Sequence, residues 1–304
     1  MSTVQTADLG SAVGADAAST YTRLGVIGCG LMGSGIAEVA ARSGLDVAVR
    51  EIDESALAAG RARLTASLDR GVRAGKLSEA DRDAVLGRLS FTTDLGDFAD
   101  RDVVIEAVAE NEQLKAEIFG VLDKVVTRPD AILASNTSSI PIIRVAMATS
   151  RPEQVVGMHF FNPVPVQKLV EIVPSLLTSP ATAAAAESFA AGRLGKEVIR
   201  SQDRSGFVVN ALLVPYLLAA VRMLESGFAA AEDIDRGMVL GCAHPMGPLA
   251  LCDLVGLDTV ASAARSMYEE FKEPLYSPPP LLQRMVDAGL LGRKSGRGFF
   301  PYSR

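Results

Sequence analysis

The sequence predicts an α/β domain with a doubly wound, mostly parallel sheet, followed by an all-helical domain. From Arg23 to about Asp203, short runs rich in β-branched residues alternate with helical stretches, which is the pattern of a parallel sheet covered by helices on both faces. After Asp203 the strand signal stops and only helical periods continue. We therefore expect a first domain over residues 23–204 and a helical domain over residues 205–304.

Glycine and proline separate the predicted elements. Gly44, Gly75 and Gly195 are placed to end three helices of the first domain, because glycine is favoured just after a helix. Pro215 lies inside an apolar helical segment and predicts a kink, since proline lacks the backbone donor. In chain order the predicted strands are LGVIG, DVAVRE, DVVIEAV, AILAS, VVGMHFF, KLVEIV and KEVIRS, and the helical segments of the second domain are FVVNALLVPYLLAAVRMLESG, AEDIDRGMVLGC, PLALCDLVGLDTVASAARSMYEEF and PPLLQRMVDAG.

The composition is that of a globular protein without a basic tail or a membrane span. Of the 304 residues, 48% are hydrophobic and 22% are charged, so burial can offset the entropy lost on folding. A net charge of −6 argues against nucleic acid as a partner. The longest apolar run, Ala211 to Val221, is interrupted by Pro215 and is shorter than the ~18 residues that a span needs, so we expect no membrane partner.

Cysteine usage and the N-terminal segment indicate a cytoplasmic protein. Cys29, Cys242 and Cys252 form no CxxC pair and cannot build an even disulfide framework, which favours a reducing compartment. Residues 1–20 contain no Lys or Arg and no apolar core, unlike a signal or transit peptide. We expect residues 1–22 to form a disordered leader.

A glycine-rich turn follows the first predicted strand. Gly28, Gly30 and Gly33 have the GxGxxG spacing, and a helix follows directly, which is typical of a Rossmann-type dinucleotide-binding unit. Gly28 allows the tight turn, Gly30 lets a pyrophosphate approach the backbone, and Gly33 lets the helix pack closely on the strand. The positive end of the helix dipole then faces the phosphates.

Glu51 at the end of the second predicted strand favours NAD as the dinucleotide. Its carboxylate is placed to accept hydrogen bonds from the adenosine ribose diol. Arg50 beside it and Arg42 in the preceding helix leave NADP as the second choice, because an arginine can accommodate the extra phosphate.

His159 and Glu171 are the candidates for proton transfer. His159 lies at the end of a predicted strand, where open α/β sheets place their chemistry, and Glu171 is a carboxylate in an otherwise apolar strand. If the NPVPVQ connection brings the two strands together, Glu171 can hold the tautomer of His159 and stabilise its charged form. The alternative is a histidine that is hydrogen-bonded in the core without a catalytic role.

A polar cluster, SNTSS at residues 135–139, follows another predicted strand of the same sheet. Its hydroxyl groups can bind an alcohol or carbonyl oxygen. The alternative role is capping of a helix predicted over residues 140–148, since Ser and Thr are preferred caps. We expect one hydroxyl to cap that helix and others to be available.

These residues carry a resemblance to a known family. The segments SNTSS, HFFNPVPVQKLVEIV, SGFVVNALLVPYLLAA, CAHPMGPLALCDLVGLD and GRKSGRGFF are similar, in this order, to the 3-hydroxyacyl-CoA dehydrogenase family, from about Arg23 to Tyr302. The resemblance implies an NAD-dependent enzyme that interconverts short-chain L-3-hydroxyacyl-CoA and 3-ketoacyl-CoA by hydride transfer. It also implies a homodimer through the helical domain.

The resemblance implies a role for each matching residue. His159 becomes the general base, Glu171 its orienting partner, and Ser138 and Asn210 the groups that hold the substrate oxygens. Without the family, Asn210 would be read only as a polar residue hydrogen-bonded at a helix contact. The resemblance also places cofactor contacts at Glu110, Lys115 and Lys294, and we assign Leu31, Met32, Ser138 and Asn162 to the cofactor as well. The charges of Glu110 and Lys115, at a helix start, would otherwise be read as a solvated face.

A basic helix is the candidate site for the coenzyme A part of the substrate. Residues 54–76 carry five basic and two acidic side chains, a local charge of 5 − 2 = +3 in an acidic protein. Ser67 matches the family's coenzyme-binding serine, and the basic residues assigned to the phosphates are Arg70, Arg73 and Lys76. The alternative is a solvated basic face.

Two further functions and one further site were considered. A sugar-acid or other 3-hydroxy acid dehydrogenase needs the same base but leaves the basic helix without a coenzyme to bind, and a nucleotide-binding sensor needs no proton acceptor. His244 lies between two cysteines, but no second compact ligand pair accompanies it, so we expect packing and no metal site.

Overall fold

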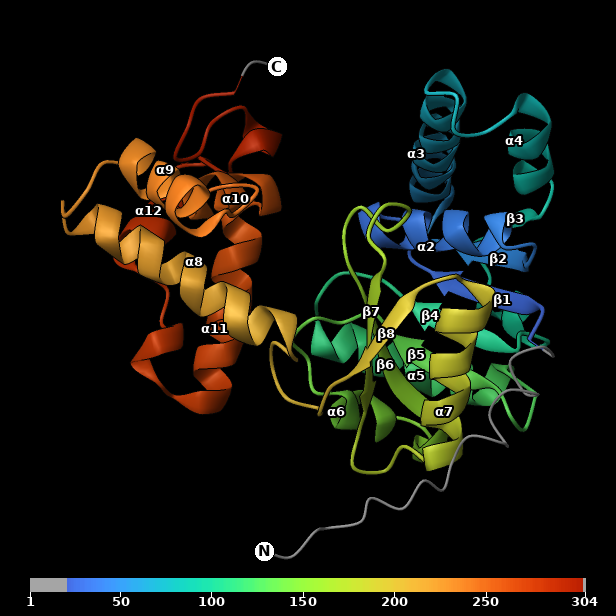
Figure 1. Ribbon diagram of the computed structural model, residues 1–304. Coiled ribbons are helices and arrows are strands. Elements are labelled where there is room, and N and C mark those ends of the chain that lie inside the picture. The colour runs from blue at the N-terminus through green and yellow to red at the C-terminus, as the bar shows by residue number, and fades with distance from the viewer. Residues whose placement is uncertain (1–20, 303–304) are drawn as a thin grey trace, which may run out of the picture. The chain divides into compact units, whose positions relative to one another are not determined.

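The computed structural model describes residues 21–302, which divide after Asp203 into two compact units (Figure 1). Most of the predicted leader, residues 1–20, lies outside the described residues. For its last two residues the prediction of disorder is wrong: Tyr21 is buried and packs edge-on against Phe189, and the Thr22 amide donates to Asp102 at 2.6 Å. The aromatic side chain at position 21 thus belongs to the core of the first unit.

The first unit is a Rossmann-type unit built on one eight-stranded sheet, as the alternation of strands and helices predicts. The strand order is β3-β2-β1-β4-β5-β6-β7-β8, and every neighbouring pair is parallel except β6 and β7. The strands are β1 (Arg23–Ile27), β2 (Asp46–Arg50), β3 (Leu89–Thr92), β4 (Val103–Glu106), β5 (Ile132–Ser135), β6 (Val155–Phe160), β7 (Leu169–Pro174) and β8 (Glu197–Arg200). Because β1, β4, β5 and β6 run the same way, their carboxyl ends lie at one edge of the sheet.

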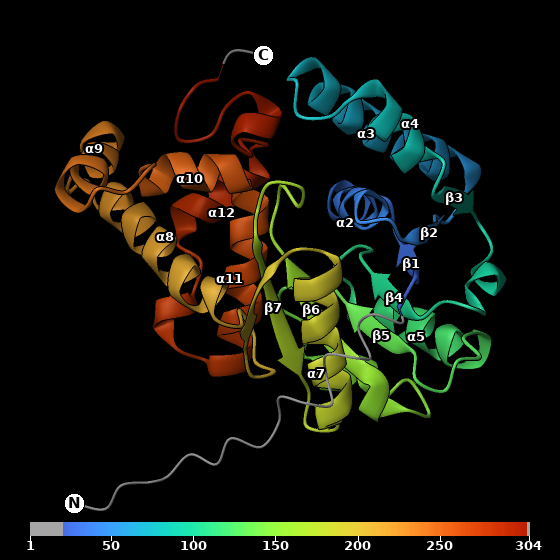
Figure 2. The same cartoon turned by 45° about the vertical axis from the view of Figure 1, so that its right-hand side comes forward.

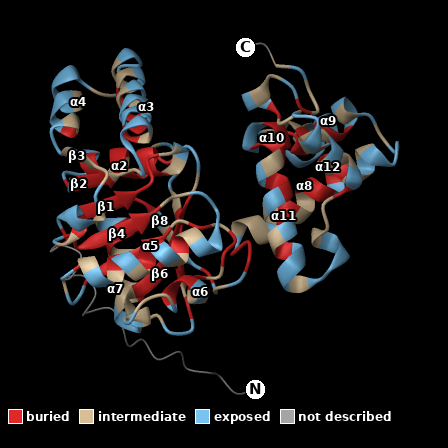
Figure 3. Cartoon of the chain, turned by 180° about the vertical axis from the view of Figure 1, so that it is seen from behind, coloured by how far each residue is buried: buried red, intermediate tan, exposed pale blue. Residues whose placement is uncertain are grey.

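Helices cover both faces of this sheet (Figure 2). On one face, α2 and α7 contribute Ile36, Ala40 and Ala186 to a core shared with the strands, while α5 and α6 pack together against the other face. Figure 3 shows the strands buried between these layers. The helices of this unit are α2 (Leu31–Arg42), α3 (Glu54–Arg73), α4 (Glu79–Leu86), α5 (Glu112–Val125), α6 (Ile142–Ala146) and α7 (Pro180–Ser188), with short helical turns at η1 (Leu95–Phe98), η2 (Pro152–Gln154) and η3 (Phe189–Arg193).

The three predicted helix ends are confirmed, but one strand and one helix were missed. Gly44, Gly75 and Gly195 follow their helices with φ of 88°, 67° and 65°, the left-handed region that glycine adopts without strain. The missed strand β3 is a four-residue edge strand, and only its pairing with β2 identifies it. The missed helix α4 begins at a cap in which Ser78 accepts a hydrogen bond from the Asp81 amide.

The second unit is helical, as predicted. It consists of α8 (Val209–Glu225), α9 (Ala231–Cys242), α10 (Pro248–Val255), α11 (Leu257–Phe271) and α12 (Pro280–Asp287), with short turns at η4 (Pro274–Tyr276) and η5 (Arg293–Ser295). Helix α8 continues through Pro215. The segment predicted as one helix from Pro248 to Phe271 is divided at Gly256, whose φ of 102° no helical residue adopts. Within residues 21–302, no helix is long and apolar enough to cross a bilayer.

Candidate active site

The glycine turn joins β1 to α2 and has the properties that a dinucleotide pyrophosphate requires. Gly28 has φ of 88°, and a Cβ at Gly33 would lie 1.8 Å from the Gly28 carbonyl oxygen, so both positions exclude a side chain. A Cβ at Gly30 would meet nothing within 4 Å. Helix α2 starts here without a side-chain cap and without an acidic residue in its first turn, which leaves its positive end for an anion.

Glu51, the residue after β2, reaches this turn. Its carboxylate accepts hydrogen bonds from the Cys29 amide at 2.5 Å and from the Ile52 amide at 3.1 Å. The two arginines that left NADP open are engaged elsewhere: Arg50 donates to the Thr93 carbonyl, and Arg42 lies 3.5 Å from Glu38. A carboxylate beside the glycine turn matches a ribose diol and repels a 2′-phosphate, which favours NAD.

Around the turn, the remaining residues assigned to the cofactor differ in exposure. Leu31 is 63% exposed, Met32 is partly buried, and Asn162, two residues beyond the end of β6, is exposed. The thiol of Cys29 is buried, and burial followed by the charge of Glu51 raises its pKa to about 11. Cys29 is therefore a protonated packing residue of the turn.

His159 and Glu171 face each other on the neighbouring antiparallel strands β6 and β7. They are direct cross-strand partners in the register, and His159 Nδ1 lies 2.6 Å from Glu171 Oε2. Glu171 is completely buried and His159 is 6% exposed, with Phe161 tilted against the imidazole at 4.6 Å between ring centroids. A carboxylate at Nδ1 keeps the proton on that nitrogen, which makes Nε2 the basic nitrogen of the neutral ring.

The SNTSS loop follows β5, and its hydroxyls play different parts. Thr137 Oγ1 accepts from the Ile140 amide at 2.9 Å and is buried, whereas Ser138 is half-buried. None of the five residues caps helix α6, so that prediction is wrong. The cap is Asp203, which accepts from the Ile142 amide at 2.6 Å and the Ile143 amide at 2.8 Å.

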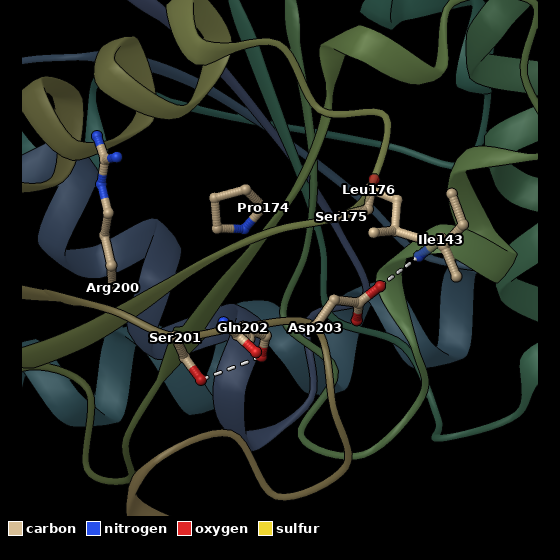
Figure 4. Close-up of a pocket in the computed structure, with 8 residues that line it drawn as sticks. All are labelled: Ile143, Pro174, Ser175, Leu176, Arg200, Ser201, Gln202 and Asp203. Carbon is tan, nitrogen blue, oxygen red and sulfur yellow. Dashed lines mark hydrogen bonds between the residues drawn. The ribbon is translucent and has the colours of Figure 1, made fainter.

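Asp203 lies in a pocket that is separate from the His159–Glu171 pair. Figure 4 shows its carboxylate bound to the Ile143 amide, with Pro174 and Arg200 in the same pocket. Pro174 pairs with Val156 near the start of β6, while His159 is near its end. Burial raises the pKa of Asp203 although two amides donate to it. This pocket carries no part of the proposed chemistry.

Glu110 and Lys115 do not form a solvated face, which corrects that alternative. Lys115 is 1% exposed, and its Nζ lies 2.7 Å from Glu106 and 3.3 Å from Glu110. Burial alone would raise the pKa of Glu110, but the Lys115 charge and hydrogen bonds from Thr137, Ser138 and Ser139 hold it below its ordinary value. Lys115 is thus part of a buried polar network at the ends of β4 and β5, and Glu110 is the solvent-exposed member of that network.

Sequence reasoning missed Glu106 and did not connect it to Ser135, which it named only as part of the SNTSS cluster. Both are completely buried, and Ser135 Oγ donates to Glu106 Oε2 at 2.7 Å. The signal was present, because Glu106 stands in the apolar run DVVIEAV as Glu171 stands in KLVEIV. A carboxylate in a buried strand requires donors, and here they come from the next strand and helix.

The basic residues assigned to coenzyme A lie on and just beyond α3. Ser67 is half-buried on α3, and Arg70, Arg73 and Lys76 are exposed, the last beyond the end of the helix. Within the described part of the chain, none of these three cations forms an ion pair. Arg63, on the same helix, instead donates to the Cys29 carbonyl at 2.6 Å and so supports the glycine turn.

The second unit holds the other assigned residues. Asn210 is the second residue of α8, and Lys294 Nζ lies 2.6 Å from both carboxylate oxygens of Asp258. His244 Nδ1 is 3.0 Å from the Tyr216 hydroxyl, with the two rings edge-on. Among residues 21–302 no group of three His, Cys, Asp or Glu side chains could hold a metal ion.

Comparison with known proteins decides the family. The model of the 3-hydroxyacyl-CoA dehydrogenase NAD binding domain matches residues 23–204, and that of the C-terminal domain matches residues 206–302. The chain belongs to the 3-hydroxyacyl-CoA dehydrogenase family. The predicted oxidoreductase class of this family and NAD as its cofactor are therefore confirmed.

Relatives of this 3-hydroxyacyl-CoA dehydrogenase are similar over almost the whole chain. A 3-hydroxybutyryl-CoA dehydrogenase of Mycobacterium tuberculosis is 63% identical over 280 residues, which cover 92% of this chain and 98% of the relative. The crystal structure of FadB2 from the same species superposes with a TM-score of 0.92 at 62% identity, covering 93% of this chain and 99% of the other. The (S)-3-hydroxybutyryl-CoA dehydrogenase of Ralstonia eutropha has a TM-score of 0.88 at 45% identity, covering 94% and 100% of the two chains.

Proposed function

We propose that this enzyme interconverts short-chain L-3-hydroxyacyl-CoA, such as 3-hydroxybutyryl-CoA, and the 3-keto thioester. The observation that carries the proposal is the buried His159–Glu171 pair, which lies at the same sheet edge as the glycine turn. The printed activity of the Mycobacterium tuberculosis and Ralstonia eutropha relatives supports the short chain. A histidine base beside a nicotinamide cofactor is the chemistry that oxidation of a β-hydroxyl requires.

The residues divide the reaction among them. NAD, when bound, supplies the acceptor for the hydride that leaves C3 of the substrate. Nε2 of His159 takes the proton of the C3 hydroxyl, and Glu171 stabilises the imidazolium that results, since its carboxylate is fixed at Nδ1. Ser138 and Asn210 hold the substrate oxygens in this scheme. In the reverse direction the imidazolium returns the proton to the developing alkoxide.

The turn at Gly28–Gly33 and Glu51 hold the cofactor in this proposal. The open space above Gly30 takes the pyrophosphate, and Glu51 takes the ribose diol. Glu110 and Lys115 approach the cofactor from the polar network at the ends of β4 and β5. Lys294 is assigned to the cofactor by the family resemblance. The other residues assigned to the cofactor are Leu31, Met32 and Asn162.

One substrate comparison separates this function from its two alternatives. NADH oxidation is followed with acetoacetyl-CoA, with free acetoacetate and with the 3-keto form of a sugar acid. We expect turnover with acetoacetyl-CoA at a kcat/KM far above that of the two free acids. Preference for a free acid would favour another 3-hydroxy acid dehydrogenase, and NADH binding without turnover of any compound would favour a sensor.

Reversing the charge of the exposed cations on α3 is expected to weaken acyl-CoA binding. Arg70 and Arg73 are exposed and unpaired with any described carboxylate, so they are available to the phosphates of coenzyme A. We expect Arg70→Glu/Arg73→Glu to raise KM for acetoacetyl-CoA by roughly tenfold at low salt, with less effect at high salt. The measurement is steady-state kinetics at two ionic strengths.

A truncated substrate provides the control for this variant. Acetoacetyl-N-acetylcysteamine carries the thioester but no phosphate, so its KM should be the same for both proteins. An unchanged KM for acetoacetyl-CoA would show that the basic face is only solvated. An equal rise in KM for both thioesters would place the effect away from the phosphates.

We also propose a homodimer formed through the helical unit. Leu212 on α8, Phe228 after it and Leu240 on α9 are 74%, 79% and 71% exposed, so three large apolar side chains of this unit are available to a second copy of the chain. We expect sedimentation velocity to give twice the monomer mass at assay concentration, and Leu212→Glu/Leu240→Glu to give the monomer. A monomeric wild-type protein would contradict this assembly.

A cytoplasmic location remains our proposal on the evidence of the cysteines. All three are free: Cys29 and Cys252 are buried and Cys242 is exposed. An unpaired exposed thiol is typical of a reducing compartment. We expect cell fractionation to recover the enzyme with cytoplasmic markers, whereas recovery from an oxidising compartment would contradict the proposal.

A further inference from the structure

Glu106, the last residue of β4, has no part in the function described so far. It is completely buried and accepts three hydrogen bonds at 2.7 Å, from the Lys115 ammonium, the Val108 amide and the Ser135 hydroxyl. Three donors hold this buried carboxylate in one position. Its neighbours connect it to the loop that carries Ser138.

The first connection runs through β5. Ser135 donates its hydroxyl proton to Glu106, and its oxygen accepts from the Thr137 amide at 3.2 Å. The orientation of the hydroxyl is therefore fixed by the carboxylate, and the main chain at Thr137 is held by the hydroxyl. This connection fixes the start of the loop.

The second connection runs through Lys115 and Glu110. Lys115 Nζ lies 2.7 Å from Glu106 and 3.3 Å from Glu110 Oε2. The other oxygen of Glu110 accepts from the amide of Ser138 at 3.0 Å and from the amide of Ser139 at 3.2 Å. The same oxygen also accepts from the hydroxyls of Thr137 and Ser139. Glu110 thus binds the main chain on both sides of the Ser138 side chain.

The charges of the three residues explain why Glu106 matters for the loop. Lys115 is buried between two carboxylates and cannot be hydrated, so its charge must be balanced by them. Because Glu106 makes the shorter contact, Glu110 can keep one oxygen on the loop amides. If the charge of Glu106 were lost, Glu110 would be the remaining carboxylate near the ammonium and would be drawn toward it.

We propose that Glu106 is a positioning residue for the substrate oxygen site, acting on Ser138 through Lys115 and Glu110 on one side and through Ser135 on the other. The proposal rests on the role of Ser138 in the proposed function. Glu106 touches neither substrate nor cofactor in this scheme. Its effect on the reaction is the placement of the Ser138 main chain, to which a transition state is sensitive on the scale of about 1 Å.

A double-mutant cycle separates positioning from a purely structural role. Glu106→Gln, Ser138→Ala and the double variant are compared by kcat and KM with acetoacetyl-CoA and NADH. We expect Glu106→Gln to lower kcat by roughly 10- to 100-fold with KM for acetoacetyl-CoA within about threefold, because a displaced loop loses transition-state contacts. In the Ser138→Ala enzyme, adding Glu106→Gln should lower kcat by less than about threefold more, because the side chain that Glu106 positions is absent.

The other outcomes of this cycle contradict either the positioning role of Glu106 or the role of Ser138. If the two losses multiply, Glu106 does not act through Ser138 and the proposal fails while the proposed function stands. If Ser138→Ala alone leaves kcat unchanged, the role of Ser138 fails, and this proposal fails with it. If Glu106→Gln leaves kcat unchanged, the loop does not depend on Glu106.

Two further variants keep the test independent of folding. Ser135→Ala keeps every charge and removes only the hydroxyl connection, so if Glu106→Gln does not fold, the cycle is run with Ser135→Ala and an expected kcat loss of roughly 2- to 10-fold. If the kcat losses of Ser135→Ala and Ser138→Ala multiply in their double variant, the proposal is overturned in the same way. Glu117→Gln removes an exposed carboxylate of α5 and serves as the matched control with unchanged kcat.

Discussion

Replacing His159 with alanine is expected to lower kcat by roughly 10²- to 10⁴-fold, a loss of about 3–5 kcal/mol of transition-state stabilisation. The reason is that Nε2 is the group we assign to the proton of the C3 hydroxyl, and Glu171 already occupies Nδ1 at 2.6 Å. Without the imidazole, water must take the proton. Steady-state kinetics with acetoacetyl-CoA and NADH measure the loss.

The other histidine of the chain provides the matched control. His244 contacts Tyr216 in the second unit, and His244→Ala should leave kcat within about threefold of the wild-type value. NADH affinity, followed by fluorescence titration, should be unchanged in His159→Ala because the glycine turn does not involve His159. Near-normal turnover of His159→Ala would remove this residue from the mechanism.

Replacing Lys115 with methionine is expected to cost about 3–5 kcal/mol of unfolding free energy. Lys115 is 1% exposed and supplies the charge that balances Glu106, which is completely buried. Methionine fills a similar volume but leaves the buried Glu106 carboxylate without its cation. Removing one partner of a buried ion pair is strongly destabilising because it leaves an uncompensated charge. Urea unfolding in the absence of NAD measures the change.

Lys124→Met is the matched control for this stability change. Lys124 is on the same helix, α5, and is exposed, so the same substitution should change the unfolding free energy by less than about 0.5 kcal/mol. Equal destabilisation by the two substitutions would indicate a general effect of charge on α5. Full stability of Lys115→Met would show that the ion pair with Glu106 contributes nothing to the folded state.

Patterns within short segments were sufficient to predict much of the fold. Strand runs such as DVAVRE and AILAS become parallel strands because both faces of the sheet are covered, so their central residues, 47–49 and 132–134, are apolar and buried. The edge strand β3 has no fully buried residue, and its sequence LSFT alternates apolar and polar residues over only four positions. Such a segment is too short for its period to be recognised.

Contacts of the site between two strands that are adjacent in the sequence could be predicted. Contacts between segments far apart in the sequence could not. The contact of His159 with Glu171 follows from a short connection between two strands. The cap of α6 by Asp203 joins residues 60 and 61 positions apart, and no pattern near Ser135–Ser139 indicates it. From the residues alone, Lys115 has the pattern of a solvated charge at a helix start, whereas the carboxylate of Glu106 at the end of β4 determines its burial.

In the proposed mechanism His159 and Glu171 act as one proton-accepting unit, and the rate of single-turnover hydride transfer depends on that unit. The rate at which NADH absorbance appears with 3-hydroxybutyryl-CoA is compared in wild type, His159→Ala, Glu171→Gln and the double variant. If the two side chains form one unit, Glu171→Gln lowers the rate of hydride transfer strongly in the wild-type enzyme but by less than about threefold in the His159→Ala enzyme. Losses that multiply in the double variant would contradict the account.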